Sequence, residues 1–249
     1  MPPSRRSIRS NGAAPATAVP RRAAAPRART GGAGHAAPGK GSAPTVVLLV
    51  RHGTTPTTGK VLPGRAPGLH LSEAGRRQAD VVASRMAELA TPPSVIYTSP
   101  LERARETAAP TAKVLGLRPR TDRGLVECDV GSWTGASHAR LVKRPEWSHV
   151  QRWPSGFRFP DGESFAEMSV RANDAVLRLA RAHPGQTVVA VSHADPIKAV
   201  VASASGVPLD LFQRFVISPC SISALVFGPG GTHVLCVNST GSLRELVLS

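Results

Sequence analysis

The sequence predicts an α/β protein, a three-layer sandwich in which a mostly parallel sheet is covered by helices on both faces. From residue 45 onward, short apolar runs rich in Val, Ile and Leu alternate with stretches that have the periodicity of amphipathic helices. The apolar runs show no alternation of polar and apolar residues, as is typical of parallel strands that are buried on both faces. Together these observations favour strands that are joined by crossover helices.

The first predicted strand covers residues 45–50 and is apolar after its initial Thr. A helix is expected over residues 72–90, with Ser72 as its N-cap. Four apolar side chains share one face of this helix, namely Ala79, Val82, Met86 and Leu89. We expect this face to pack against the sheet.

Residues 94–98 form the second predicted strand. The segment Ser99-Pro100-Leu101-Glu102 has the spacing of a capping box, with Pro at the first helical position. We therefore expect Ser99 to cap a helix that runs to about Leu115, where Gly116 ends it.

The second half of the chain continues this alternation. Ser164-Phe165-Ala166-Glu167 is another capping box and predicts a long helix, which a third apolar strand follows at residues 187–191. Asp195-Pro196 have the residue types of an N-cap and a first helical residue, and Gly206 is expected to end that helix. Two further runs on either side of a Gly-rich turn predict a β-hairpin, at residues 221–227 and 233–237.

The positive charge of the chain is concentrated in its first part. The formal net charge is +15, and residues 1–44 contain eight basic residues and no acidic residue. These residues are almost entirely Ala, Pro, Arg, Gly, Ser and Thr, so we predict a disordered tail there and one domain over residues 45–249. The role of the tail stays open between an organelle transit peptide, an anion-binding arm and an extension without function.

The composition argues against several classes of protein. No aromatic-interleaved basic stretch or zinc-finger spacing supports specific nucleic-acid recognition. No apolar stretch reaches the ~18–20 residues that a membrane-spanning helix needs. The three cysteines, Cys128, Cys220 and Cys236, fit neither a disulfide framework nor a paired metal site. We therefore expect free thiols and a cytoplasmic location, and the sequence leaves a homodimer open.

Polar side chains that suit phosphate chemistry follow all three predicted parallel strands. Arg51-His52-Gly53 ends the first strand, and Ser99 and a helix that carries Arg103 follow the second. His193 follows the third strand. Because ligands in open α/β sheets bind outside the carboxyl ends of the strands, we expect these side chains to converge at one edge of the sheet.

Two arginines and two histidines at one edge are suited to phosphoryl transfer. Guanidinium groups bind phosphate oxygens bidentately, and helix N-termini add further donors. Nearby cations disfavour the protonated form of a histidine, which leaves a ring nitrogen free to attack phosphorus. The same cations stabilise the charge of the transferring group.

The order of these motifs resembles that of the histidine phosphatase superfamily, also called the phosphoglycerate mutase-like proteins. The resemblance covers roughly residues 45–240. It rests on Arg51-His52-Gly53, Leu71-Ser72-Glu73-Ala74-Gly75, residues 99–108, Leu125-Val126-Glu127 with Gly131, Trp133 and Gly135, residues 160–164 with Arg171, and Val191-Ser192-His193. The resemblance implies the phosphoglycerate mutase-like form of the predicted sandwich.

The resemblance also implies roles for individual residues. His52 would be the phosphorylated nucleophile, and Glu127 would protonate the leaving oxygen and then help to activate water. Arg51, Arg103 and His193 would hold the phosphoryl oxygens. The arginines and histidines supply the positive charge, so neither a metal nor a cofactor is expected. The expected partner is a small phosphorylated substrate.

Two positions depart from the family's pattern. Many members have an asparagine seven residues after the first arginine, where this chain has Thr58. A hydroxyl can still donate, so Thr58 is carried over only as a candidate phosphate ligand. Ala194-Asp195 follow the second histidine in place of the commoner glycine pair, and we expect this change to alter the floor of the pocket.

The expected function is hydrolysis of a small phosphorylated metabolite through a phosphohistidine. The first alternative is a phosphomutase, although the long insert of cofactor-dependent mutases is not recognisable between Glu127 and His193. The second is a non-catalytic phospho-ligand-binding module on the same fold. Such a module would need the arginines but neither His52 nor Glu127.

Overall fold

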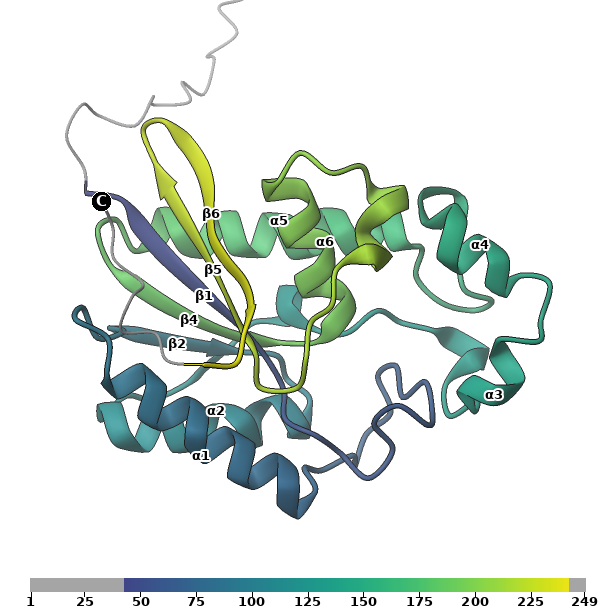
Figure 1. Ribbon diagram of the computed structural model, residues 1–249, viewed down its shortest axis with the longest axis horizontal. Coiled ribbons are helices and arrows are strands. Elements are labelled where there is room, and N and C mark those ends of the chain that lie inside the picture. Colours follow the sequence, from purple (N-terminus) through teal and green to yellow (C-terminus); the bar gives the residue numbers. More distant parts are fainter. Residues whose placement is uncertain (1–42, 242–249) are drawn as a thin grey trace, which may run out of the picture. The chain divides into compact units, whose positions relative to one another are not determined.

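The computed structural model describes residues 43–241 of the chain (Figure 1). The predicted tail lies outside the described residues except for residues 43 and 44. The first strand, β1, begins at Thr45, where the domain was predicted to start.

In the described part of the chain, six strands form one mixed sheet in the order β3-β2-β4-β1-β5-β6. The strands are β1 (Thr45–Arg51), β2 (Val95–Thr98), β3 (Arg120–Thr121), β4 (Thr187–Ser192), β5 (Ile222–Gly228) and β6 (Gly231–Ser239). The first four of these are parallel, whereas β5 and β6 form an antiparallel hairpin that pairs with β1. The mostly parallel sheet and the C-terminal hairpin are both confirmed.

Two pairs of helices cover opposite faces of the sheet (Figure 1). The pairs are α1 (Glu73–Ala87) with α2 (Glu102–Leu115), and α5 (Phe165–Ala182) with α6 (Ala194–Ala204). Side chains of β1 alternate between the two layers: Leu48 and Val50 pack with α1 and α2, whereas Val47 and Leu49 pack with α5 and α6. The predicted three-layer α/β sandwich is therefore confirmed.

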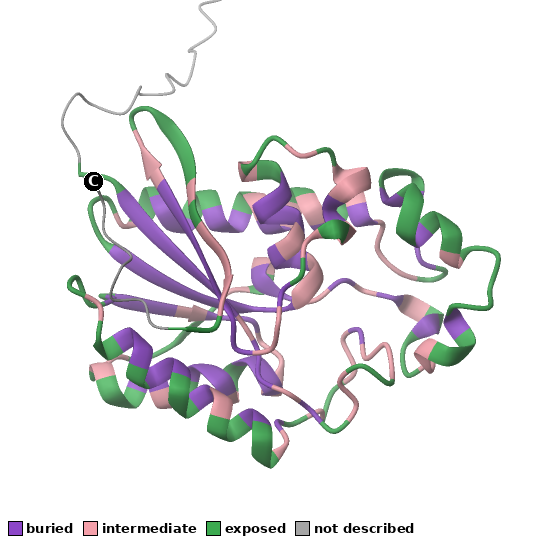
Figure 2. Cartoon of the chain, in the orientation of Figure 1, coloured by how far each residue is buried: buried purple, intermediate pink, exposed green. Residues whose placement is uncertain are grey.

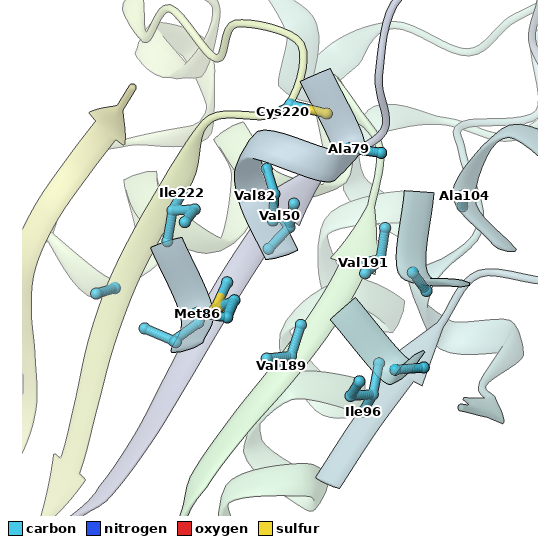
Figure 3. Packing of buried hydrophobic residues seen from close by; sticks show 14 of the residues in the cluster. Val50, Ala79, Val82, Met86, Ile96, Ala104, Val189, Val191, Cys220 and Ile222 are labelled. Carbon is cyan, nitrogen blue, oxygen red and sulfur yellow. The ribbon is translucent and has the colours of Figure 1, made fainter. Parts of the chain in front are cut away.

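The α1–α2 face of the core is almost purely aliphatic (Figure 3). Val82 and Met86 of α1 point toward Val50 of the sheet, and Ile96 lies beneath α2. Burial is continuous along the central strands and falls off toward the outer faces of the helices (Figure 2). This packing fixes the position of the strand ends, and with them the residues that follow.

Short helices and 3₁₀ turns make up the segment between β3 and α5. The α-helical ones are α3 (His138–Leu141) and α4 (Trp147–Arg152). Single 3₁₀ turns of this segment occur at Arg123–Leu125, Gly131–Trp133 and Pro154–Gly156. A longer 3₁₀ helix, Leu209–Arg214, follows α6. An aromatic cluster that includes Trp133, Phe159 and Phe212 holds this segment against α5 and α6.

The helix ends test the predicted caps. Ser72 caps α1, the capping box at Ser164 is present, and Gly116 ends α2 with a φ of 65°. The expectation that Ser99 caps α2 is wrong, because the helix begins at Glu102 and the Ser99 hydroxyl contacts His193 instead.

The start of α6 also differs from the prediction. The helix begins at Ala194, and His193 rather than Asp195 occupies the N-cap position. Asp195 lies in the first turn, where its carboxylate pairs with Lys198. In α1 the last helical residue is Ala87, so the helix ends before the predicted residue 90. No helix among residues 43–241 is long and apolar enough to cross a membrane.

Candidate active site

The residues that follow β1 and β4 lie side by side at the carboxyl edge of the sheet. Arg51 pairs with Ser192 in the parallel register, so the two residues that come next, His52 and His193, are neighbours. Their ring centroids are 5.1 Å apart at an interplanar angle of 60°. The convergence that the sequence predicted is confirmed for these two histidines.

The backbone beside His52 determines which of its ring nitrogens is free. Nδ1 lies 2.7 Å from the carbonyl oxygen of Gly53. Because a carbonyl can only accept, Nδ1 carries the proton and Nε2 keeps its lone pair. Burial, followed by the positive charge of Arg103, lowers the pKa of His52 to about 3. The ring is therefore neutral at physiological pH.

The residue after His52 has to be a glycine. A Cβ at Gly53 would lie 2.7 Å from the carbonyl oxygen of Gly75, in the first turn of α1. The amide of Gly53 also donates to the hydroxyl of Thr107 in α2, at 3.0 Å. The loop after β1 is thus clamped between α1 and α2, and this fixes the position of the His52 ring.

Arg103 comes from the first turn of α2 and is completely buried. Its Nε donates to Nε2 of His52 at 3.3 Å, and its Nη2 donates to the carbonyl oxygen of Gly64 at 2.8 Å. Nη1 has no hydrogen-bond partner among the described residues. Arg51 is similar: Nη1 donates to the carbonyl oxygen of Ile217 at 2.6 Å, and the buried Nε has no partner in this part of the chain.

His193 is also completely buried, and its Nε2 lies 2.7 Å from the hydroxyl of Ser99. That hydroxyl oxygen accepts from the amide of Leu101 at 3.4 Å, so its own proton is available for Nε2. This arrangement favours the tautomer in which His193 carries its proton on Nδ1, and within residues 43–241 this atom has no partner. Burial, and then the charge of Arg103, holds the pKa of His193 well below its usual value.

Buried donors without partners are rare in folded proteins because each costs about 1–3 kcal/mol. Three such donors, Nε of Arg51, Nη1 of Arg103 and Nδ1 of His193, belong to residues that gather around His52. Donors of this kind suit a ligand that offers several acceptor oxygens. This arrangement fits a tetrahedral oxyanion such as phosphate.

Glu127 lies on the cavity wall, in the loop after the 3₁₀ turn at Arg123–Leu125. Its Oε1 accepts from the amide of Cys128 at 2.9 Å. Burial and then the negative charge of Asp195 raise the pKa of Glu127 to about 7. The carboxyl group can therefore both give and take a proton near neutral pH.

Two arginines hold the backbone on either side of Glu127. Arg65 Nε donates to the carbonyl oxygen of Glu127 at 2.8 Å, and Arg171 Nη1 donates to that of Val126 at 2.9 Å. Both guanidinium groups also pair with the carboxylate of Glu163, at 2.9 and 2.8 Å. From the sequence, Glu163 and Arg171 are recognisable only as parts of a motif, and Arg65 is not recognisable because no local pattern marks it.

Thr58 lines the same cavity but is engaged within its own turn. Its hydroxyl oxygen accepts from the amide of Thr55 at 2.8 Å and lies 3.0 Å from the Thr55 hydroxyl. The hydroxyl of Thr58 thus stabilises this turn, and the role of Thr58 as a phosphate ligand stays a prediction.

The cavity beside these residues has a volume of about 520 Å³. Arg51, His52 and Glu127 contribute to its lining, whereas Arg103 and His193 are completely buried and are not among the lining residues. No cluster of three or more potential metal-ligating side chains occurs among the described residues.

The Lys and Arg side chains of residues 136–160 do not line the cavity, whereas His138 does. Arg144 stacks on Trp133, with its guanidinium carbon 5.1 Å from the ring centroid, and Arg158 forms an ion pair with Glu167. Both arginines are exposed. These two arginines are therefore surface charges.

Comparisons with known proteins identify the family. The chain matches the model of the histidine phosphatase superfamily (branch 1) over residues 47–240. It is 35% identical over 205 residues to the bifunctional protein Rv2228c of Mycobacterium tuberculosis, and this match covers 80% of the chain and 55% of that protein. The chain therefore spans about half the length of this relative. It is 31% identical over 206 residues to phosphoserine phosphatase 1 of Hydrogenobacter thermophilus, covering 80% of this chain and 94% of that protein.

Solved structures agree with this result. A mycobacterial glucosyl-3-phosphoglycerate phosphatase, Rv2419c, superposes with a TM-score of 0.70 at 25% identity, covering 79% of this chain and 100% of that one. Phosphoserine phosphatase of Entamoeba histolytica, in complex with 3-phosphoglyceric acid, gives a TM-score of 0.71 at 26% identity, with coverages of 79% and 98%. The motifs, the fold and these matches lead to one conclusion: the chain belongs to the histidine phosphatase superfamily.

Proposed function

We propose that this protein hydrolyses phosphate monoesters through a phosphohistidine at His52. One observation carries the proposal: His52, whose Nε2 is unprotonated, contacts Arg103 and His193, and these two residues and Arg51 each have a buried donor without a partner in the described part of the chain. A phosphoryl group bound by those donors would be held next to the nucleophile. A module that only binds phosphate would need the donors but not a neutral imidazole aimed at the phosphorus.

In the first step, Nε2 of His52 forms a bond to phosphorus as the bond from phosphorus to the ester oxygen breaks. The leaving oxygen takes the proton of Glu127, so the alcohol departs neutral. Arg51 and Arg103 stabilise the negative charge on the three remaining oxygens. The raised pKa of Glu127, about 7, keeps a substantial fraction of this group protonated at neutral pH.

In the second step, a water molecule attacks the phosphohistidine, and the carboxylate of Glu127 accepts a proton from it. The bond between phosphorus and Nε2 breaks, and inorganic phosphate leaves. His52 returns to its neutral form because burial and Arg103 lower its pKa to about 3. The same two residues thus serve both halves of the cycle.

A phosphomutase would have to retain the phosphoryl group and bind a second anionic group of the substrate. Apart from Arg51, the cavity lining contains one Lys or Arg side chain, Lys198, which is already paired with Asp195. Phosphatases are also among the relatives, including phosphoserine phosphatase 1 of Hydrogenobacter thermophilus. Both points support water as the acceptor.

The test separates the two steps with 4-nitrophenyl phosphate, whose leaving group departs without needing a proton. Wild-type protein should turn over this ester, and His52→Ala should lose turnover. Glu127→Gln should still release one equivalent of 4-nitrophenol and then stall as phosphohistidine, which intact-protein mass spectrometry at neutral pH would detect. The exposed His149 provides a matched control, so His149→Ala should behave as wild type.

Two outcomes would contradict the proposal. If wild-type protein neither turns over the ester nor forms phosphohistidine, the enzymatic function is wrong. If phosphohistidine forms on wild-type protein but is discharged only when a second phosphorylated metabolite is added, the protein is a mutase.

The predicted cytoplasmic location is part of this proposal. The three cysteines are free thiols in the structure, which supports a reducing compartment. The proposal assigns catalysis to residues 45–249 and gives the tail no part in it. Removal of residues 1–44 should therefore leave the turnover of 4-nitrophenyl phosphate unchanged.

A further inference from the structure

The cavity lining extends beyond Arg51, His52 and Glu127, the members of the proposed phosphoryl site that line it. The part of the lining away from these three residues, the outer wall, is largely apolar. Three separate segments contribute to this wall: the loop after β1, helix α4, and the residues after the 3₁₀ helix Leu209–Arg214. The apolar side chains that they supply are Val61, Leu62, Trp147, Val150, Phe215 and Val216. The cavity volume of about 520 Å³ is within the usual range for a small-molecule site.

Backbone hydrogen bonds hold one side of this wall in place. Leu62 donates to the carbonyl oxygen of Ala136 at 2.9 Å and accepts from the amide of Gly135 at 2.9 Å. Val61 forms an isolated antiparallel bridge with Ser137. The loop after β1 is thus tied to the segment that leads into α3, so this part of the wall exists before a ligand arrives.

Val216 is the least protected member of the wall. Its side chain is 68% exposed although it borders the cavity. Trp147 is half-buried, and its ring stacks on that of Trp133 at a centroid distance of 6.4 Å. Apolar surface that stays exposed at the mouth of a binding site is not buried by the protein itself, so a ligand can bury it.

The charged groups of the wall neutralise one another. Beyond Arg51, His52 and Glu127, the ionisable side chains in the lining are His138, Asp195 and Lys198. Lys198 Nζ lies 3.4 Å from Asp195 Oδ1 and 2.8 Å from Gln213 Oε1. Apart from Arg51, the Lys and Arg side chains of the described lining are limited to Lys198, which is already engaged, so a substrate carboxylate would find no further guanidinium or ammonium group there to bind it.

We propose that the outer wall selects phosphate monoesters whose leaving group is an apolar alcohol, such as an alkyl or aryl alcohol, over esters that carry a carboxylate beside the phosphate. This inference rests on the proposed function, because the outer wall acts on the alcohol of an ester whose phosphoryl group is held at His52. The phosphoryl group would occupy the inner end of the cavity, and the alcohol chain would extend along Val61 and Leu62 toward Val216.

A series of primary alkyl phosphates tests the inference without changing the chemistry. Ethyl, butyl and hexyl phosphate have leaving groups of nearly equal basicity and differ in apolar area. Each methylene that becomes buried should raise kcat/KM by about two- to fourfold, from the usual free energy of burying a methylene. The kcat/KM for hexyl phosphate should also be higher than that for phosphoserine or 3-phosphoglycerate.

Variants of Val216 connect the effect to the wall. Val216→Ser should flatten the dependence on chain length, and Val216→Arg should raise kcat/KM for phosphoserine relative to hexyl phosphate. Val170 of α5 is the matched control, since its side chain is 71% exposed and does not line the cavity. Val170→Ser should leave the chain-length dependence as in wild type.

Alkylphosphonates, which cannot be hydrolysed, make the two proposals separable. Their affinity, measured by calorimetry, should rise with chain length even if no ester is turned over. Rising affinity without turnover would leave the apolar site intact and refute the proposed hydrolysis. Turnover that needs His52 but is equal for ethyl and hexyl phosphate, or higher for phosphoserine than for hexyl phosphate, would refute the apolar site and leave the proposed function standing.

Discussion

Glu127→Gln should stabilise the folded protein at neutral and alkaline pH although it impairs catalysis. The substitution keeps the shape of the side chain and the acceptor for the Cys128 amide but removes the ionisable group. In the folded protein, burial and then Asp195 raise the pKa of Glu127 to about 7, compared with its ordinary value of 4.5. The folded state therefore binds the proton more tightly than the unfolded state does.

The size of the effect follows from this difference in pKa. Below pH 4.5 the group is protonated in both states and does not favour unfolding. As the pH rises from there to about 7, the folded state becomes less stable relative to the unfolded state, and above about 7 the loss is constant. A difference of about 2.5 pKa units corresponds to about 3 kcal/mol.

Urea unfolding of wild type and Glu127→Gln at several pH values between 5 and 8 measures this effect. The free energy of unfolding of the variant should exceed that of wild type by less than about 1 kcal/mol at pH 5 and by about 3 kcal/mol at pH 8. The buried histidines also make stability depend on pH, but they are present in both proteins, so their contribution cancels in the difference. The exposed Glu73 provides the control, and Glu73→Gln should show no such rise.

A raised pKa of Glu127 would be contradicted if Glu127→Gln were no more stable than wild type at pH 8, or if the difference in stability between them did not change with pH. Either result would mean that the carboxylate is well solvated in the folded protein. The elevated pKa on which the general-acid role depends would then be absent as well.

Three further substitutions test the surroundings of the site. Asp195→Asn removes a negative charge that raises the pKa of Glu127, so the alkaline limb of the pH profile of kcat/KM should move to lower pH; an unmoved limb would contradict this. Ser99→Ala removes the hydroxyl that orients His193. Loss of this buried hydrogen bond, at about 1–3 kcal/mol of transition-state stabilisation, should lower kcat by roughly 10- to 100-fold. A change in kcat below threefold would show that the hydroxyl has no such role. Glu163→Gln weakens two arginine pairs and should destabilise the protein by about 1.5–3 kcal/mol in urea unfolding, and an unchanged midpoint would argue against the network.

The elements of the fold that depend on local pattern were predictable from the sequence. The strand at residues 45–50 is recognisable because it is buried on both faces, and that burial demands an uninterrupted apolar run. Gly116 marks the end of α2 because a left-handed residue is needed there. The convergence of His52 and His193 at one edge was also predictable, because each follows an apolar strand; that β1 and β4 are direct neighbours is seen only in the structure.

What the sequence did not predict depends on long-range contacts. Ser99 has the local signature of a helix cap, but the buried ring of His193 provides a partner 94 positions away, and no local pattern reveals that contact. Arg65 lies in an irregular loop, and its role becomes visible only when the loop is placed against the carbonyl oxygen of Glu127. The outer wall of the cavity combines three distant segments for the same reason.

The hydrogen bond from Arg103 Nε to Nε2 of His52 has a consequence for the resting enzyme. The lone pair that is proposed to attack phosphorus accepts this hydrogen bond from the guanidinium group that is also proposed to bind the substrate. An incoming molecule gains access to this nitrogen only if it draws the guanidinium group toward itself, and an anion does so far better than a neutral electrophile. Under the proposed mechanism, His52 would therefore be shielded between turnovers, and an arriving phosphate group would both free its nitrogen and supply its target.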